Sequence, residues 1–332
     1  MRTTRHTLLA AAVVAAVTFT TGCASREGTI TPNLSETNKA LVKRTWEEVV
    51  NQGNLDAAKE FFSENYVYHS SIGSVFNGIE EGVIVTVSSL RKAFPDLHCT
   101  VEDLIAEGDK VAYRWSATGT HTAEYVGVAP TKQLVHMTGI YISRIENGKV
   151  AEDWSCGDDL GILQQLGAFL TADRVTYTWG ESSERGSGTP CSPEQSRALY
   201  EREFEEVWTL GDLNALDEII HPEFVNHDPP WSAVADFESF KAWGDKWINS
   251  APNMHVTIED IVVEGNILVG RWVARWTDEK GMLGFGPTGK ELSVNGIDMI
   301  RCVDGKVVER WWAKNNLGVI NQLEVVTDLP DF

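Results

Sequence analysis

The sequence is poor in basic residues and, beyond its N-terminal segment, has no long apolar run. Its 332 residues include 28 Lys and Arg against 48 Asp and Glu, for a formal net charge of −20. Recognition of a phosphate backbone relies on clustered basic side chains, so this composition argues against a nucleic-acid partner. No later apolar run approaches the roughly 20 residues that a membrane-spanning helix needs.

Signatures of several catalytic classes are also missing. The chain has no Ser-His-Asp ordering, no Gly-rich phosphate loop, no His-x-x-x-His pair and no Cys-x-x-Cys pair. We therefore expect neither a metal nor a cofactor. Four cysteines follow the N-terminal segment, and the sequence leaves open whether they pair as disulfides: Cys99, Cys156, Cys191 and Cys302.

The N-terminal segment has the pattern of an export signal. Arg2 and Arg5 form a positive start, and a short apolar run from Leu8 to Phe19 follows. This run is shorter than a transmembrane helix, which favours a cleaved signal peptide over residues 1–22.

Small residues followed by Cys23 resemble the bacterial lipobox, which implies cleavage before Cys23 and acylation of its thiol. Residues 23–34 would then tether the protein to the membrane by an N-terminal lipid anchor. The alternative is a soluble secreted protein that is cut a few residues later and loses Cys23. Both alternatives place the protein outside the cytoplasm.

The rest of the sequence carries one pattern twice. Each copy has an amphipathic helix closed by a Gly turn, then an aromatic strand ending in His, then an Arg-Trp strand and a hairpin turn of Asn-Gly or Asp-Gly. The matching segments are residues 46–49 and 204–207, 66–69 and 224–227, 114–115 and 271–272, and 147–148 and 304–305. We predict domains over residues 35–170 and 197–332, joined by a polar linker over residues 171–196.

The order of elements indicates the fold class. In each copy a helix pair precedes several strands of alternating pattern, which is typical of an α+β domain with an antiparallel sheet. We predict two tandem cone-shaped domains, each a curved antiparallel sheet wrapped around helices. The mouth of such a cone is a usual place for a small-molecule pocket.

The motifs of the first copy, in their order, resemble a SnoaL-like polyketide cyclase or ester cyclase domain of the nuclear-transport-factor-like superfamily. The resemblance covers residues 41–167 well and residues 200–326 more loosely. It implies a cavity in which a carboxylate takes a proton from the carbon next to a carbonyl, while nearby donors stabilise the enolate during an intramolecular aldol closure. The motifs that carry it are Tyr66-Val67-Tyr68-His69, Phe94-Pro95-Asp96, Glu107-Gly108-Asp109, Gly119-Thr120-His121, Pro130-Thr131 and Gly148 to Gly167.

Three residues are the candidate catalytic groups. Asp158 matches the acidic residue that the family carries after the last-strand Trp, and strand alternation puts it on one face with Trp154 and Cys156, which we expect to line the cavity. His69 and His121 are candidate orienting or donor groups. Two of them have a structural alternative: Asp158 would equally cap the segment that follows, and the strand-end His69, like His227 in the second copy, would hold the strand end to a neighbouring loop.

Other residues are expected to line a ligand pocket. In the first copy these are Tyr113, Trp115, Tyr141 and Trp154, and in the second copy His227, Trp272, Asp298 and Trp311. The second copy has Asn315 in place of Asp158, and an Asn cannot act as a base. Asp298 is a substitute base or, as the alternative, the partner of Arg271, Arg275 or Arg301 in a structural ion pair.

Two functions remain open from the sequence. One is cofactor-free acid–base catalysis of the cyclase or isomerase type in the first copy, acting on a small apolar carbonyl compound. The other is a non-catalytic lipoprotein that binds a small hydrophobic ligand or a protein partner. In both cases the two copies are expected to form an intrachain pseudo-dimer or a homo-oligomer.

Overall fold

The computed structural model of the protein describes residues 33–168, 187–227, 236–281 and 285–324. The predicted signal peptide, Cys23, nearly all of the tether and most of the linker lie outside these residues. Within the described part, no helix combines the length and apolar character needed to cross a bilayer. We call residues 33–168 copy one and residues 187–324 copy two; each is an α+β domain with one sheet, which confirms the predicted fold class.

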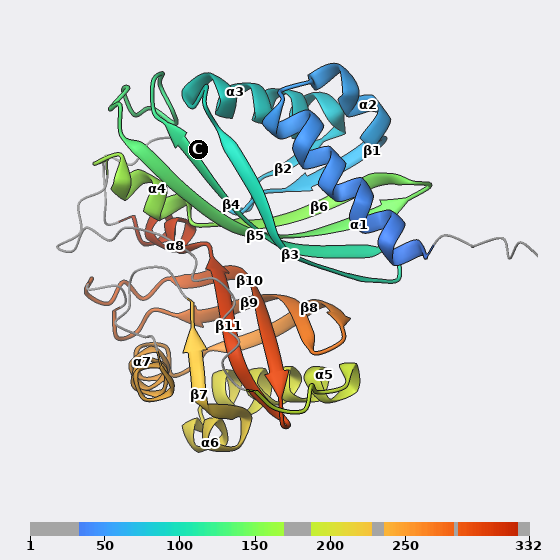
Figure 1. Ribbon diagram of the computed structural model, residues 1–332. Coiled ribbons are helices and arrows are strands. Elements are labelled where there is room, and N and C mark those ends of the chain that lie inside the picture. Colours follow the sequence, from blue (N-terminus) through green and yellow to red (C-terminus); the bar gives the residue numbers. More distant parts are fainter. Residues whose placement is uncertain (1–32, 169–186, 228–235, 282–284, 325–332) are drawn as a thin grey trace, which may run out of the picture. The chain divides into compact units, whose positions relative to one another are not determined.

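Copy one places helices against one face of a curved sheet (Figure 1). Its helices are α1 (Leu34–Thr45), α2 (Ala58–Phe61), α3 (Thr86–Ala93) and α4 (Asp159–Gln165), with π-helical turns at Trp46–Asn51 and Glu80–Val85 and a 3₁₀ turn at Leu55–Ala57. Its strands are β1 (Phe62–His69), β2 (Val75–Asn77), β3 (His98–Glu107), β4 (Lys110–Thr120), β5 (Leu134–Glu146) and β6 (Lys149–Gly157).

Copy two repeats this order. Its helices are α5 (Pro193–Arg202), α6 (Leu216–Ile219), α7 (Phe237–Ser250) and α8 (Asn316–Leu323), with a π-helical turn at Glu203–Thr209 and a 3₁₀ turn at Leu213–Ala215. Its strands are β7 (Ile220–Asn226), β8 (His255–Glu264), β9 (Ile267–Thr277), β10 (Glu291–Val303) and β11 (Lys306–Lys314).

The two sheets have matching strand orders in the described residues. They run β2-β1-β6-β5-β4-β3 in copy one and β7-β11-β10-β9-β8 in copy two. Neighbouring strands are antiparallel except for β1 with β6 and β7 with β11, which are parallel, so each sheet is mostly rather than wholly antiparallel. The parallel pair arises because the chain enters each sheet from its helices and lays its first strand beside its last.

Local sequence explains the turns that set the register. The β5–β6 hairpin turns at Asn147 and Gly148, with φ of 52° and 74°, and the β10–β11 hairpin at Asp304 and Gly305, with φ of 49° and 73°. Positive φ at both central residues is the type I′ requirement that Asn-Gly and Asp-Gly meet at low cost. These hairpins confirm the turns predicted from the sequence.

Each sheet buries both of its faces. One face packs on the helices of its own copy, and the other contributes to a cluster that contains apolar residues of both copies, among them Ile140, Cys156, Met299 and Trp311. Polar contacts flank this cluster, such as Lys110 Nζ to Asp260 Oδ1 at 2.6 Å. Because apolar residues of the central strands are buried on both faces, burial alone does not distinguish the outward face from the inward one.

Candidate functional site

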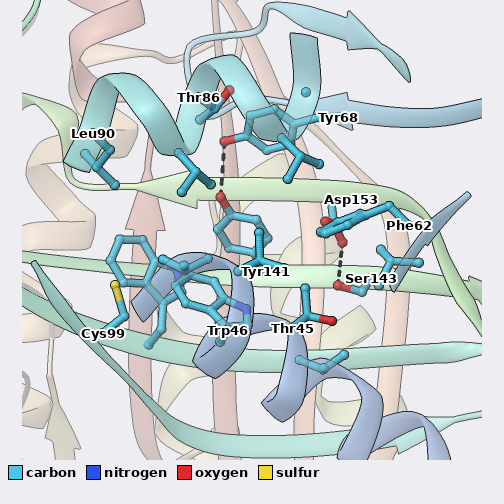
Figure 2. A pocket seen from close by; sticks show the side chains of 18 of the residues that line it. Thr45, Trp46, Phe62, Tyr68, Thr86, Leu90, Cys99, Tyr141, Ser143 and Asp153 are labelled. Carbon is cyan, nitrogen blue, oxygen red and sulfur yellow. Dashed lines mark hydrogen bonds between the residues drawn. The ribbon is translucent and has the colours of Figure 1, made fainter. Parts of the chain in front are cut away.

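An apolar cavity lies inside copy one, between its helices and the concave face of its sheet. Its volume is about 120 Å³, and side chains from α1, α3, both π-helical turns and five strands line it (Figure 2). Aromatic and aliphatic groups make up most of the wall, and a few hydroxyls and one carboxyl supply the polar atoms. The lining includes Trp46, Val50, Tyr66, Tyr68, Leu90, Cys99, Tyr113, Trp115, Tyr141, Ser143 and Asp153.

The π-helical turn at Trp46–Asn51 continues α1 and brings three of its side chains into the wall. Trp46, Val49 and Val50 stand at positions i, i+3 and i+4, which share one face of a helical turn, so all three face the interior. Gly53, with φ of 67°, then reverses the chain. The Gly turn that ends the amphipathic segment in the sequence therefore helps to shape the pocket.

Asp153 is the carboxyl group of the cavity. It lies on β6, is only 5% exposed, and accepts hydrogen bonds from Tyr66 Oη at 2.7 Å and from Ser143 Oγ. Burial raises the pKa of Asp153 to about 6, against the opposing effect of these two hydrogen bonds. A carboxyl with this pKa is ionised at neutral pH yet holds a proton more readily than an exposed aspartate, which suits a general base.

The direction of the hydrogen bonds around Asp153 is fixed by chemistry. The indole of Trp46 can only donate, and its Nε1 lies 3.0 Å from Tyr113 Oη. Because Ser143 donates to Asp153, Tyr113 must donate to Ser143 Oγ, 3.2 Å away. The donors of this chain therefore all point towards the carboxylate, from Trp46 to Tyr113 to Ser143 to Asp153. This arrangement fixes the orientation of the Asp153 carboxylate.

A second chain of hydroxyls runs beside the first on the same face of the sheet, because Tyr141 and Ser155 stand two residues from Ser143 and Asp153 on β5 and β6. Ser155 Oγ donates to the backbone oxygen of His69 at 3.3 Å, and Tyr68 Oη lies 3.0 Å from Ser155 Oγ. Tyr141 Oη lies 3.1 Å from Tyr68 Oη (Figure 2). Burial raises the pKa of both tyrosines, so both stay protonated donors. Tyr141 is the first donor of this chain, since it donates to Tyr68, which donates to Ser155. Its hydroxyl hydrogen can turn from Tyr68 to an oxygen atom of a ligand.

The predicted face of the last strand is wrong. We expected Trp154, Cys156 and Asp158 to line the cavity, whereas the neighbouring residues Asp153 and Ser155 point inward. Trp154 and Cys156 pack on the other face of the sheet, where Arg271 of copy two lies 5.1 Å from the Trp154 ring centroid. Alternation cannot identify the inner face when both faces are apolar.

Asp158 is the N-cap of α4. Its Oδ1 accepts a hydrogen bond from the backbone N–H of Gly161 at 3.1 Å, and it is not among the residues that line the cavity. Asn315 caps α8 in copy two in the same way, from Gly318 N–H at 2.7 Å. Of the two roles that the sequence left open, the geometry corresponds to the cap.

The candidate histidines also lie outside the cavity lining. His69 Nε2 is 2.9 Å from Glu152 Oε1 and its ring stacks on Trp154, while His227 Nε2 is 3.2 Å from Glu309 Oε1 and stacks on Trp311. The same contacts recur in both copies, one of which has almost no cavity, so they correspond to the strand-end role.

His121 is wholly buried beside Phe94. Its Nδ1 accepts a hydrogen bond from the Thr131 backbone N–H at 3.2 Å, so the proton of the neutral ring lies on Nε2. Burial lowers the pKa of His121, which keeps the ring neutral. The structure thus separates His69, His121 and Asp158 from the cavity, and of the lining residues predicted in copy one it brings Tyr113, Trp115 and Tyr141 together there.

Copy two fills the corresponding space with a buried ion cluster. Arg310 donates two hydrogen bonds of 2.5 Å to Glu203, and its Nε lies 3.4 Å from Asp298 Oδ2. Asp298 also accepts from Tyr200 Oη at 2.5 Å and from Trp272 Nε1 at 3.1 Å, and burial raises its pKa to about 6. The expected ion pair of Asp298 exists, but its partner is Arg310 and none of the three arginines proposed from the sequence.

The space that remains in copy two is about 20 Å³, roughly room for a single water molecule and far less than the 120 Å³ of copy one. Trp272 lines this space together with Trp208 and Trp312. Trp311 does not; it packs in the cluster shared by the two copies, with Arg114 5.1 Å from its ring centroid. His227 likewise lies outside this lining.

Sequence reasoning missed Asp153, Tyr66, Tyr68 and Ser143 as site residues. A signal existed for two of them, because Tyr66 and Tyr68 stand two apart on one strand and so share a face. No such spacing signal pointed to Asp153, which stands between Glu152 and Trp154 on β6.

Among the described residues, no group of three or more His, Cys, Asp and Glu is arranged to hold a metal ion. The four cysteines of the described residues are buried and form no disulfide.

Comparison with known proteins places these observations in a family. The family model described as SnoaL-like polyketide cyclase matches residues 40–166 and 198–323. No curated protein matches the sequence.

Similar solved structures include a SnoaL-like polyketide cyclase-type protein from Jannaschia sp. CCS1, at 25% identity over 41% of this chain and 95% of that chain, TM-score 0.39. TsrD from Streptomyces laurentii is similar at 26% identity over 41% of this chain and 99% of its own, TM-score 0.38. IdmH from Streptomyces antibioticus, described as a candidate polyketide cyclase, is similar at 29% identity over 39% of this chain and 98% of its own, TM-score 0.34.

Proposed function

Since the chain belongs to the SnoaL-like polyketide cyclase family, we propose that copy one carries out cofactor-free acid–base chemistry of the cyclase or isomerase type on a small apolar carbonyl compound. The observation that carries the proposal is the position of Asp153. Among the described residues that line the cavity it is the only one with a carboxyl group, and its raised pKa of about 6 suits proton transfer from carbon.

The chemistry follows from the two hydroxyl chains. The Asp153 carboxylate takes a proton from the carbon next to a carbonyl, and the electron pair of that C–H bond forms the enolate. Tyr141, with Tyr68 behind it, donates a hydrogen bond to the enolate oxygen, where negative charge develops. In a cyclisation the enolate carbon then bonds to a second carbonyl carbon of the same molecule, and the resulting alkoxide takes back the proton held by Asp153.

Protein groups other than Asp153 have positioning roles in this scheme. Trp46, Tyr113 and Ser143 orient the carboxylate, and Tyr66 donates to its second oxygen. These hydrogen bonds limit how far burial raises the pKa of Asp153. Removal of the Ser143 hydroxyl should therefore raise that pKa further and shift the pH profile of the reaction to higher pH.

A direct test measures exchange of the acidic C–H proton of a small ketone for deuterium by NMR. We expect Asp153→Asn to lower the exchange rate by about 100-fold or more, the usual contribution of a general base. Asp158→Asn is the matched control, because Asn315 shows that Asn caps the equivalent helix, and its rate should stay within about twofold of the original. Loss of exchange in Asp158→Asn alone would instead make Asp158 the base.

The competing function is ligand binding without chemistry. It predicts that ligand recovered from the purified protein is unchanged, and that neither substitution alters its exchange rate. Slow exchange that persists equally in the original chain, Asp153→Asn and Asp158→Asn would favour this binding function over the enzyme.

Export and lipid anchoring complete the proposal. The positive start, the short apolar run and the small residues before Cys23 support cleavage at Cys23 and acylation of its thiol. Mass spectrometry of the mature N-terminus should find a lipid-modified Cys23, and Cys23→Ser should release the protein from the membrane fraction. A mature N-terminus beyond Cys23 would mean a secreted soluble protein.

The two copies are proposed to act as an intrachain pseudo-dimer. Equivalent residues make equivalent contacts in support of this, since Arg114 of copy one lies over Trp311 and Arg271 of copy two lies over Trp154. The protein should then sediment as a monomer of 36.8 kDa before processing. A dimer in sedimentation would show that a homo-oligomer is the correct alternative.

A further inference from the structure

The size of the cavity in copy one limits what it can bind. Its volume of about 120 Å³ is below the roughly 300–1,000 Å³ of ordinary small-molecule pockets. An apolar protein cavity of roughly 150 Å³ accepts one benzene ring. A fused multi-ring molecule of the kind that a polyketide cyclase would close therefore exceeds the space available.

The charge of the cavity limits the ligand further. Among the described residues that line it, none is Lys, Arg or His, and the single ionisable carboxyl is Asp153. An anionic ligand would lose its hydration without gaining a cationic partner and would be repelled by the Asp153 carboxylate. The cavity therefore selects against carboxylates and phosphates.

The walls favour a flat ring with one acceptor oxygen. Trp46 contacts Trp115, Tyr113 and Tyr141 at ring-centroid distances of 5.4, 5.8 and 5.6 Å, so one ring face and several ring edges bound the space. The Tyr141 hydroxyl hydrogen-bonds Tyr68 at 3.1 Å, and rotation about its C–O bond can turn its hydrogen towards the carbonyl oxygen of a ligand. A neutral aryl or cyclic ketone matches both features.

Copy two shows one position at which a larger side chain narrows the interior. It carries Trp208 where copy one carries Val50, and Trp208 lines the remaining space of about 20 Å³. Val50 lines the cavity of copy one from the π-helical turn, and Leu90 lines it from α3. The chain therefore contains its own example of the same fold in which a tryptophan at this position, together with the ion cluster, takes up the interior space.

We propose that the cavity of copy one takes a neutral, enolisable ketone about the size of a single ring, and that Val50 and Leu90 set this limit. The proposal rests on the function proposed for the same cavity, since it names the substrate class of that site. It departs from the multi-ring compounds that the family name suggests.

The test separates binding from turnover. Calorimetric titration of the Asp153→Asn variant with acetophenone, 1-tetralone, anthrone and 4-acetylbenzoate compares one, two and three rings and an anion of one ring. We expect acetophenone to bind at least about tenfold more tightly than any of the others, because larger rings clash with the walls and the anion lacks a partner. Tighter binding of 1-tetralone or anthrone, or no measurable binding of acetophenone, would overturn the size limit.

Two substitutions should change the largest ligand that the cavity of copy one accepts, one making it smaller and the other larger. Val50→Trp should reduce acetophenone affinity by roughly tenfold or more, and Leu90→Ala should raise 1-tetralone affinity by roughly tenfold, since the added space is lined by apolar groups. Circular dichroism and thermal unfolding verify that each variant folds. If Leu90→Ala folds and leaves the preference for one ring unchanged, Leu90 does not set the limit and the proposal fails.

Deuterium exchange of the acetophenone methyl protons in the unsubstituted protein then tests the function separately. Binding without exchange would contradict acid–base catalysis and leave the size limit intact. Exchange of 1-tetralone faster than that of acetophenone would support the catalytic function and overturn the size limit.

Discussion

Copy one and copy two have the same strand order and the same hairpin turns, yet one has a cavity and the other a packed ion cluster. Arg310 stands on β11 where Asp153 stands on β6, and Glu203 and Asp298 stand where copy one has Thr45 and Tyr141. Copy two thus neutralises its buried carboxylates with a guanidinium, whereas copy one leaves a single carboxylate with hydroxyl partners. A few interior positions therefore decide whether this fold encloses a cavity or a packed structural core.

A paired exchange of large and small residues reinforces this difference. Copy one combines Val42 with Tyr113, and copy two combines Tyr200 with Gly270. Tyr200 comes so close to Gly270 that even a Cβ atom there would meet its hydroxyl at 2.2 Å. The tyrosine ring comes from strand β4 in copy one, as Tyr113, and from helix α5 in copy two, as Tyr200. The interior of copy two is therefore filled from the helix side instead of the sheet side.

The largest expected effect comes from breaking the ion cluster of copy two. Arg310→Ala leaves Glu203 and Asp298 buried without a cation, which should lower the free energy of unfolding by about 3–5 kcal/mol. Urea unfolding measures this loss. Asp153→Asn in copy one is the control, because no cation depends on it, and a larger loss there would contradict the contrast between the copies.

The next effect concerns activity. Asp153→Asn should lower deuterium exchange by about 100-fold, equivalent to about 2.7 kcal/mol in the barrier, whereas Asp298→Asn should leave it unchanged. The reason is that Asp298 is surrounded by Tyr200, Trp272 and Arg310 in a copy with almost no free volume. Equal losses in the two variants would show that copy two contributes to the chemistry.

The pH dependence should follow the pKa of Asp153, which is about 6. Exchange should level off above pH 7 and fall about tenfold for each unit below pH 6, because only the ionised carboxylate accepts a proton. A rate that stays constant between pH 5 and pH 7 would exclude Asp153 as the base.

Stability should change with pH in the opposite sense. The pKa of Asp153 is raised in the folded protein, so the folded state binds a proton more tightly than the unfolded chain does, and stability increases as pH falls from about 6 towards the ordinary value near 4. Asp298 contributes in the same direction. Unfolding midpoints of Asp153→Asn and Asp298→Asn against pH should each show a smaller increase than the original chain.

The smallest effect lies at the two helix caps, where the copies should behave alike. Asp158→Ala and Asn315→Ala each remove the acceptor of an N-cap hydrogen bond and should lower the free energy of unfolding by about 1 kcal/mol. Thermal unfolding compares the two. A much greater cost or a loss of activity in Asp158→Ala alone would restore a special role for Asp158.

Much of the fold was predictable because it depends on local signals. Repeated turns at Gly53 and Gly211, Asn-Gly and Asp-Gly hairpins, and alternating strands gave two α+β copies with the correct order of elements. Strand alternation placed Tyr113 and Trp115 on one face in the sequence and the family resemblance pointed to Tyr141, and all three side chains lie in the cavity lining. The sequence did not identify Asp153. Along β6, either Asp153 or its neighbours Glu152 and Trp154 could face the cavity, and the alternation of side chains does not say which.

The sequence by itself determined the duplication, the fold class, the turns and the absence of clustered basic residues, since each depends on residue type and spacing along the chain. The tertiary structure decided which face of β6 is interior, because both faces of the sheet are buried and only the packing of helices on one of them defines a cavity. It also decided that Asp158 is a cap, that Asp153 has a raised pKa and that copy two is filled, because burial and ion pairing depend on residues far apart in the chain.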